Sequence, residues 1–414
     1  MNIKTITLDN GLKLVLNQDK SKHRTMAVIL VKVGGLINEY YLEDELHNMP
    51  YGVAHFLEHY LLEQSIYGNC SDIFDREYIK HNGITSNYMT EYYISTVHDF
   101  EDNFIKLLNV VNNPIFETDR VEKVKKPIIA EINRKNDNKR VNLYSFISKN
   151  IFKNEMFNKN LGEIETIQNM NVDYLKDLFN IFYQPSNQII FLTGNFDDNI
   201  VNLIEDTYKS FKREYPIFKV KEKDESNEVV NNEAIYNSDI NESFFNLTYK
   251  VNISSFTPIE KNKFNYYLAY ILETNFREES ELFDYMIKNK LSLYEVTPNY
   301  NPNIKNFGLI SFVSYTEYFD EVLKLIQDRF NDLILDEEQF KNWKNRQIIQ
   351  NINKSEKNMW KTDNFINNVM LYDLYSYDDV DFIKNLNLDE CKSLLNRLDF
   401  SNYTVVKNIY KGGN

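Results

Sequence analysis

The sequence has little cysteine, glycine or proline, with 2 Cys, 11 Gly and 8 Pro among its 414 residues. The two cysteines, Cys70 and Cys391, are far apart and suggest neither a disulfide framework nor a cysteine metal site, so a reducing compartment is the default expectation. The few glycines and prolines exclude collagen-like and low-complexity chains. Apolar residues make up 43% of the chain and charged residues 26%, which allows a sizeable core and excludes wholesale disorder.

Long hydrophobic runs and an excess of positive charge are also missing. No stretch approaches the roughly 18 apolar residues of a membrane span, and the N-terminus lacks the basic start and apolar run of a signal peptide. We therefore expect no membrane span and a cytoplasmic location. The 47 Lys and Arg against 61 Asp and Glu give a net charge of −14. A general nucleic-acid binder needs a basic face, so we expect no nucleic-acid partner.

The predicted elements occur in the same closing order in both halves of the chain. Apolar periodicity predicts a helix over 172–182 and a buried strand over 188–193 at the end of the first half. The second half ends with a predicted helix over 388–398 and a strand over 403–406. This repeated order indicates a duplicated α+β fold.

A segment poor in apolar residues separates the two halves. Residues 212–233 are dense in Lys, Glu and Asn, which is typical of a linker. We therefore predict an N-terminal domain at residues 1–215, a linker at 216–235 and a related C-terminal domain at 236–414.

The strongest chemical signal is the segment HFLEH at positions 55–59, on a helix predicted over residues 51–64. His55 and His59 lie one turn apart on the same face, so both imidazoles can bind one zinc ion. Glu58 lies on the same side and can reach a water on that zinc. The order H-x-x-E-H is the inverted zincin signature. A chance occurrence on a solvated helix is the alternative, although the chain contains only six His.

A catalytic zinc also needs a third protein ligand and an open water position. Glu131 is a candidate because it lies in an apolar stretch, which a purely solvated helix would not require. Glu117 and Glu122 are alternatives in more polar surroundings, and we interpret them as surface residues. The helical pattern that contains these acids also contains Pro127, which would kink or divide the helix.

Around these residues the chain resembles the pitrilysin/insulinase family of zinc peptidases, and most of all its short, bacterial members that are similar to mitochondrial processing peptidases. Further segments match the family in order and spacing over roughly residues 1–210, and the second half matches more loosely. The matching segments are GVA at 52–54, GITSNYMT at 83–90, LGEIETI at 161–167, YQPSN at 183–187 and GNF at 194–196.

The resemblance implies two related domains, each a mainly antiparallel β-sheet with helices packed on one face. It implies a zinc-dependent endopeptidase that binds one zinc ion per chain, with His55, His59 and Glu131 as ligands and Glu58 as general base. The zinc would acidify its water and polarise the scissile carbonyl. Glu58 would take the water proton and pass it to the leaving amine.

The resemblance also implies substrate-binding residues in each half. The segment around Asn87 and Tyr88 is expected to be an open strand edge that pairs with an extended peptide, and an ordinary turn and strand is the alternative. In the second half, Tyr294 matches the tyrosine of an Arg-Tyr pair that reaches the substrate. The arginine position holds Ile287, and the adjacent Lys288 would point to a different face of the helix.

A second departure from the family lies near the third ligand. The family usually has a Glu seven residues before that ligand, and this position is Val124 here. Loss of such a supporting contact can weaken a metal site roughly 10–100-fold.

These departures leave several hypotheses open. The first is the zinc-bearing subunit of a heterodimer, in which a homologous partner supplies the Arg-Tyr pair and the two enclose the peptide substrate in a chamber. The chain could instead form a homodimer in which Tyr294 or Lys288 suffices. By analogy, the task could be leader removal from a ribosomally made peptide. A different class is a non-catalytic scaffold or binding subunit of the same fold, and the remaining alternative is an unrelated protein whose matches are coincidental.

Overall fold

The computed structural model describes residues 3–154, 161–211, 213–221, 225–238, 242–292, 294, 296–304, 306–355, 358–374 and 379–410. Its packing divides the chain into two compact units, each assembled from three segments. Unit 1 comprises Met1–Lys135, Lys159–Asp224 and Ser355–Ile366, and unit 2 comprises Asn136–Asn158, Glu225–Lys354 and Asn367–Asn414. The predicted linker at 216–235 contains β9 (Phe218–Val220) and the start of β10 (Glu233–Ser238), and the predicted domain boundaries stay a prediction.

Unit 1 is built on a six-stranded sheet in the order β1-β2-β8-β3-β7-β6. All of its neighbouring strands are antiparallel except β2 and β8. Its strands are β1 (Lys4–Thr7), β2 (Lys13–Gln18), β3 (Thr25–Val31), β6 (Lys80–Thr85), β7 (Thr90–Thr96) and β8 (Gln188–Gly194). A turn at residues 9–11 joins β1 and β2, and Gly11 adopts a positive φ of 83° there, which suits glycine.

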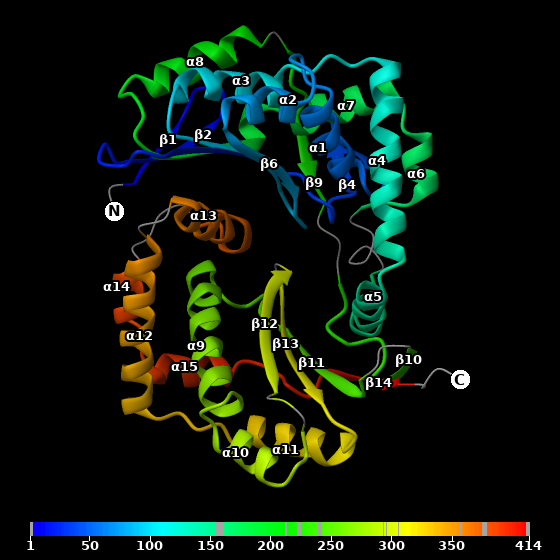
Figure 1. The fold of residues 1–414 in the computed structure, drawn as a ribbon, viewed down its shortest axis with the longest axis vertical. Helices are drawn as coiled ribbons and strands as arrows, with labels where there is room; N and C mark the ends of the chain where they lie inside the picture. The colour runs from blue at the N-terminus through cyan, green and yellow to red at the C-terminus, as the bar shows by residue number, and fades with distance from the viewer. Residues whose placement is uncertain are drawn as a thin grey trace. The chain divides into compact units, whose positions relative to one another are not determined.

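Helices cover one face of this sheet, and Figure 1 shows α3 and α8 running above β1, β2 and β6. The helices of unit 1 are α1 (Val53–Glu63), α2 (Cys70–Phe74), α3 (Phe100–Asn112), α4 (Thr118–Asn136, whose last residue falls in unit 2), α6 (Ile164–Asn169), α7 (Val172–Phe182) and α8 (Ile200–Ser210). A second, three-stranded sheet joins β4 (Glu39–Leu42) to β5 (Glu45–Asn48) and β9. On the opposite face of the large sheet, Phe365 stacks on Phe191 of β8 with ring centroids 4.3 Å apart.

Unit 2 repeats this arrangement with a five-stranded sheet in the order β10-β14-β11-β13-β12. Its strands are β10 and then β11 (Phe244–Asn252), β12 (Thr297–Ile304), β13 (Phe307–Tyr315) and β14 (Tyr403–Tyr410). The pair β10–β14 is parallel and the other three pairs are antiparallel. Strand for strand, this matches β2-β8-β3-β7-β6 of unit 1, so the predicted α+β fold with two related domains is confirmed.

The helices of unit 2 pack mainly on one face of its sheet, beside which Figure 1 shows α9, α10 and α11. They are α9 (Pro258–Phe276), α10 (Glu281–Lys288), α11 (Phe319–Asn331), α12 (Glu337–Ser355), α14 (Asp379–Lys384) and α15 (Leu388–Leu395), while α13 (Asn358–Tyr372) has residues in both units. On the opposite face, α5 (Lys139–Ile151) packs Leu143 and Ile147 against Phe244 and Val406.

The sequence predicts that Pro127 kinks or divides this helix, and the second alternative is wrong, because α4 runs unbroken through Pro127. A proline inside a helix costs one hydrogen bond and a steric clash, about 3 kcal/mol. Here Val121, Val124 and Ile128 are all buried, at 1% exposure or less, on the side of the helix that packs into the core of unit 1. This burial offsets the cost, because each fully buried aliphatic side chain contributes about 1.5–3 kcal/mol.

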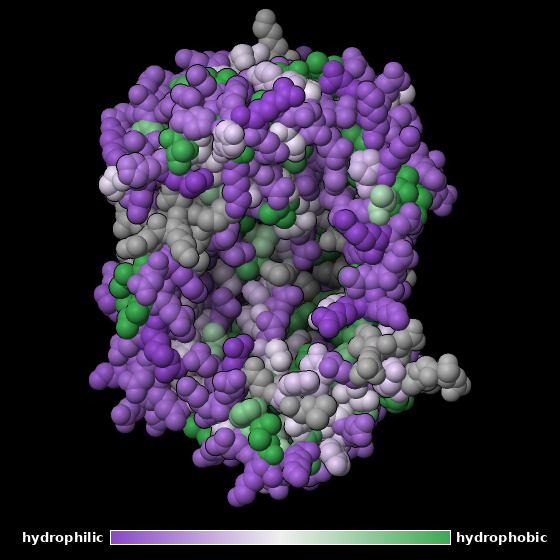
Figure 2. Space-filling view, viewed as in Figure 1, coloured by the Kyte–Doolittle hydropathy of each residue, from purple (hydrophilic) through white to green (hydrophobic). Residues whose placement is uncertain are grey.

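Polar residues dominate the surface that Figure 2 shows, with small and separate apolar patches. Across the part of the chain that the structure describes, no helix is long and apolar enough to cross a membrane.

Candidate metal and catalytic site

Helix α1 begins where two glycines bring distant segments together. Gly52 precedes the helix with a φ of 87°, and a Cβ added there would lie 2.6 Å from the carbonyl oxygen of Leu161. Gly162 has the same constraint, since its added Cβ would lie 2.7 Å from the carbonyl oxygen of Tyr51. The segments at 52–54 and 161–167 that match the family therefore pack on each other, and together they fix the start of α1.

The structure brings together the three predicted metal ligands. His55 and His59 lie on one side of α1 with ring centroids 4.6 Å apart, and His55 is only 7% exposed. Glu131 comes from α4. Its Oε2 lies 3.5 Å from Nε2 of His55 and 3.6 Å from Nε2 of His59.

These three side chains fit a zinc ion. Each offers one ligand atom, and all three atoms lie within 4.8 Å of one another. Zinc bonds of about 2.0–2.1 Å in tetrahedral geometry place ligand atoms roughly 3.3 Å apart, close to the two observed distances. A set of two His and one Glu leaves a fourth position open, which is the composition of a catalytic site rather than a structural one.

Glu58 lies beside the metal ligands and is 8% exposed. Burial raises the pKa of its carboxyl, although a hydrogen bond from Thr85 and the charge of His59 act in the opposite direction. The Thr85 hydroxyl donates to Glu58 Oε2 at 2.6 Å. A raised pKa makes the Glu58 carboxylate a stronger base than an ordinary carboxylate, which suits a group that must accept a proton and then return it.

Gly83 of β6 allows the strand to approach this carboxyl. A Cβ added there would lie 2.6 Å from Cδ1 of Leu62 and 2.9 Å from Cγ of Glu58. The position therefore requires glycine because of its neighbours, and β6 passes directly over Glu58.

The two histidines sit in different electrostatic surroundings. Burial, the neighbouring His59 and the charge of Lys135 lower the pKa of His55 to about 3, so this imidazole is neutral at physiological pH. Neutral imidazole is the form that binds a metal.

Burial acts to lower the pKa of His59 as well, but a hydrogen bond to Glu63 and the charges of Glu63, Glu58 and Glu131 raise it overall. Glu63 Oε1 lies 2.7 Å from Nδ1 of His59. The sequence reasoning did not single out Glu63. Its spacing of four residues from His59 on one helix was the signal that could have found it.

The two alternative third ligands lie on the surface. Glu117 and Glu122 have side chains that are 57% and 59% exposed, and each pairs with a cation of α4, Arg120 and Lys125 respectively. Among the described residues, only Glu131 joins the histidines in a group that could hold a metal.

Asn87 and Tyr88 lie in the turn between β6 and β7, just after the last strand of the sheet. The Asn87 carbonyl already accepts a hydrogen bond from the Leu36 N–H at 2.8 Å. The open edge is β6 itself, which is the last strand of the six-stranded sheet. A role of the two side chains in substrate binding stays a prediction.

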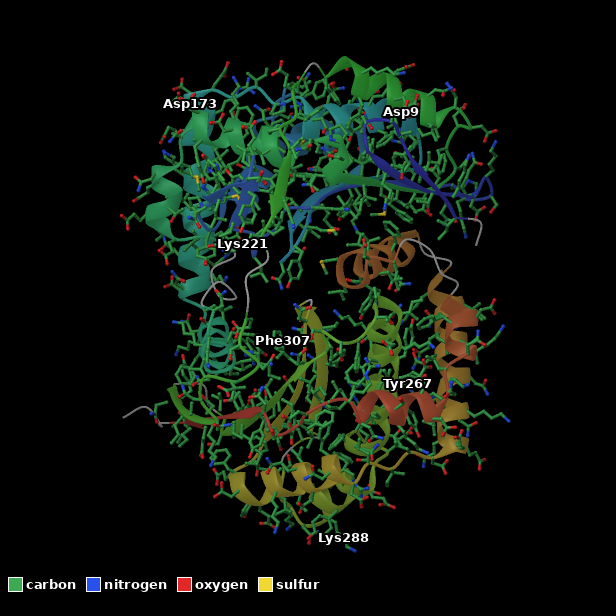
Figure 3. All side chains as sticks on the ribbon, turned by 180° about the vertical axis from the view of Figure 1, so that it is seen from behind. Asp9, Asp173, Lys221, Tyr267, Lys288 and Phe307 are labelled. Atoms are coloured by element: carbon green, nitrogen blue, oxygen red, sulfur yellow. The ribbon has the colours of Figure 1, made fainter. Side chains whose placement is uncertain are left out.

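In unit 2, Tyr294 is 56% exposed and its ring packs edge-on against Tyr315 with centroids 5.6 Å apart. Ile287, at the expected arginine position, is 43% exposed on α10. Lys288 is exposed at the end of the same helix, and Figure 3 labels it on the surface of unit 2.

Two family models match this chain, and together they cover most of it. The model for the insulinase family, peptidase family M16, matches residues 13–163, and the model described as the M16 inactive domain matches residues 169–347. The chain belongs to the insulinase family. The H-x-x-E-H segment and Glu131 both fall within the first model, and α9 and α10 fall within the second.

Relatives of this M16 chain include an uncharacterized zinc protease, YmfH, from Bacillus subtilis, with 32% identity over 47% of this chain and 46% of the relative. The chain spans less than half the length of the curated relatives that it matches. An M16-like peptidase from Alicyclobacillus acidocaldarius has the same fold, with 20% identity, a TM-score of 0.85 and coverage of 99% of this chain and 98% of the other. The M16 inactive domain from Pseudomonas fluorescens is also similar, with 17% identity, a TM-score of 0.77 and coverage of 99% and 98%.

Proposed function

We propose that this M16 chain is a zinc-dependent endopeptidase that acts on peptides or unfolded segments. The observation that carries the proposal is the meeting of His55, His59 and Glu131 at 3.5–3.6 Å, with the buried carboxyl of Glu58 beside them. A non-catalytic member of the fold would have no need to keep all four residues in this arrangement.

Each residue has a distinct task in this proposal. His55, His59 and Glu131 would hold the ion, and zinc, when bound, supplies Lewis acidity and lowers the pKa of a water toward about 7. Glu58 accepts the proton of the attacking water and returns it to the leaving amine. Thr85 holds Oε2 of Glu58, which leaves the other carboxylate oxygen available for the proton.

The free edge of β6 supports a peptide as the substrate. This strand pairs with β7 on one side only, and its exposed side chains include Lys80, Asn82 and Ile84. An extended segment can add to such an edge through main-chain hydrogen bonds. Because Gly83 lies within the same strand, the added segment would pass close to Glu58.

The test compares wild type with Glu58→Gln on an unfolded protein substrate, with zinc content measured on the same samples. We expect zinc in both proteins and cleavage only by the wild type. Equal cleavage by Glu58→Gln would contradict the role of Glu58, and an inactive but zinc-loaded wild type would point to a missing partner.

We further propose that the chain is the zinc-bearing subunit of a heterodimer. The support is Ile287 at the expected arginine position and the exposure of Lys288 at the end of α10. Leader removal from a ribosomally made peptide is the task proposed by analogy. The solution mass and activity of the purified chain test the assembly, because a homodimer that is active by itself contradicts the heterodimer.

A scaffold or binding subunit is the second candidate function. Val124 and Ile287 favour it, since they stand where the resemblance implies a Glu that supports the metal site and an Arg that reaches the substrate. A wild-type chain that takes up no zinc after supplementation would support this candidate over the peptidase.

A further inference from the structure

The last residue of helix α1, Glu63, has its carboxylate beside the imidazole of His59, one of the candidate metal ligands. Glu63 lies four residues after His59, so the two side chains share one helix face. The distance between Glu63 Oε1 and Nδ1 of His59 is 2.7 Å, which is typical of a strong, charge-assisted hydrogen bond. Both side chains are partly buried, at 28% and 21% exposure, so water competes only weakly for either group.

This hydrogen bond determines which nitrogen of His59 faces the metal. A neutral imidazole carries its proton on one nitrogen only, and an ionised carboxylate can only accept. The proton therefore sits on Nδ1 and points at Glu63. Nε2 is left with its lone pair directed toward Glu131, whose Oε2 lies 3.6 Å away.

The other histidine has no such support. Nδ1 of His55 is buried and finds no hydrogen-bond partner among the described residues. Its orientation comes from packing, since the residue is 7% exposed and its ring contacts that of His59 edge-on. The two ligands on α1 are therefore not equivalent, and only His59 has a carboxylate behind it.

Helix α4 offers no substitute for Glu63. Val124 stands where the family resemblance implies a supporting Glu, and its side chain is fully buried in the core of unit 1. Glu131, the acid of α4 that does reach His59, faces Nε2 and not Nδ1. The supporting carboxylate thus comes from α1 itself.

We propose that Glu63 is the positioning residue that fixes the tautomer and orientation of His59, in place of an acid on α4. This inference rests on the proposed metal site. Since a partner on Nδ1 lies on the opposite side of the ring from a metal on Nε2, Glu63 supports the site without being a ligand. Loss of a hydrogen bond that supports a metal ligand in this way typically weakens metal binding about 10–100-fold.

The first experiment measures zinc affinity of the full chain by competition with a chromophoric chelator. We expect the dissociation constant to rise about 10–100-fold in Glu63→Ala. Glu63→Gln should lose less, because its amide oxygen can still accept the Nδ1 proton. Glu122→Gln is the matched control, since it removes an exposed acid from unit 1. Equal affinity of wild type and Glu63→Ala would overturn the proposal.

The second experiment reads the tautomer directly in the metal-free chain. Selective ¹⁵N labelling of the six histidines at pH 9 distinguishes a protonated Nδ1 from a protonated Nε2, with His59→Asn for assignment. We expect Nδ1–H at His59 in wild type and Glu63→Gln, and its loss in Glu63→Ala. Nε2–H in the wild type would contradict the proposal.

The two readouts separate the possible failures. A wild type that binds no zinc would contradict the proposed function. The tautomer of His59, measured in the metal-free chain, would still test the role of Glu63. If Glu63→Ala does not fold, as judged by circular dichroism, Glu63→Gln decides: its affinity must fall below that of the wild type, and an unchanged affinity counts against the proposal.

Discussion

The sheets of the two units share an arrangement of five strands, but a buried charged residue has different surroundings in each unit. In unit 2, Lys250 and Glu225 form a fully enclosed pair, with Nζ and Oε1 2.7 Å apart and side chains 0% and 4% exposed. In unit 1, burial, Asp363 and Glu58 raise the pKa of Glu91 to about 7, and the described residues give Glu91 no ion pair. The comparison teaches that unit 2 pairs its buried cation with a buried carboxylate, whereas unit 1 keeps Glu91 near Glu58 without a cation beside it among the described residues.

The helices at corresponding places in the two sheets show the same difference. Helix α1 packs against β6 and carries the H-x-x-E-H segment, while α9 packs against β12 and has no histidine. The polar groups of α9 are engaged structurally, as in the ion pairs of Glu273 with Arg346 and Lys263 with Glu390. The two units thus have the same fold, but the candidate site residues of these two helices lie in unit 1 only. Function depends on the residues of a site and not on the architecture that carries them.

The largest effect should come from the carboxyl that is buried beside the metal ligands. Glu58→Gln should reduce peptide cleavage about 100–10,000-fold, the usual contribution of a general base, with zinc retained. The control is Glu281→Gln in unit 2, where an 80% exposed side chain pairs with Arg329. A comparable loss in both variants would remove the difference between the units.

Breaking the buried pair of unit 2 should act on stability instead. Lys250→Met leaves Glu225 buried without its cation and should cost about 3–5 kcal/mol in the free energy of unfolding. The double variant with Glu225→Gln should lose less than the single one, since no charge is then left unpaired. Urea denaturation measures both, and an unchanged stability in Lys250→Met would show that the pair contributes nothing.

Substituting one glycine in each unit distinguishes an effect on packing from an effect on peptide cleavage. Gly83→Ala places a Cβ against Glu58 and Leu62, and Gly308→Ala places one 2.6 Å from the buried ring of Tyr300. Overpacking should cost each variant about 1–3 kcal/mol of stability. Only Gly83→Ala should also lower the turnover rate of peptide cleavage. A rate loss of equal size in Gly308→Ala would contradict the placement of the site in unit 1.

The smallest effect concerns Glu91 and pH. Its folded pKa of about 7 lies above the ordinary value of 4.5, so folding favours the protonated form, and stability falls as pH rises from about 4.5 to 7. Glu91→Gln should therefore stabilise the chain at pH 8, by on the order of 1–2 kcal/mol, and change little at pH 4.5. Denaturation curves at both pH values check this, and a destabilised variant at pH 8 would show that the carboxylate is paired.

Sequence reasoning found what depends on local spacing. The helix with His55 and His59 and the repeated closing order of the halves both follow from periodicity. Glu131 needed the family resemblance as well, because nothing local ties it to His59. Glu63 was visible at helical spacing but was one of many acids on the chain.

What sequence reasoning missed depends on contacts between distant segments. Helix α5 belongs to unit 2 because Leu143 and Ile147 pack against Phe244, and no local sequence pattern shows this contact. The Lys250–Glu225 pair is likewise a tertiary contact. Pro127 was misjudged because its cost was weighed without the burial of Val124 and Ile128 around it.

The most direct test of the central claim is the zinc content of the purified full chain, with Glu131→Ala beside it. Three ligand atoms from α1 and α4 should hold close to one zinc ion per wild-type chain, and Glu131→Ala should lose it. A wild type without zinc after supplementation, or a Glu131→Ala chain that keeps the metal, would contradict the assignment of His55, His59 and Glu131 as the metal centre.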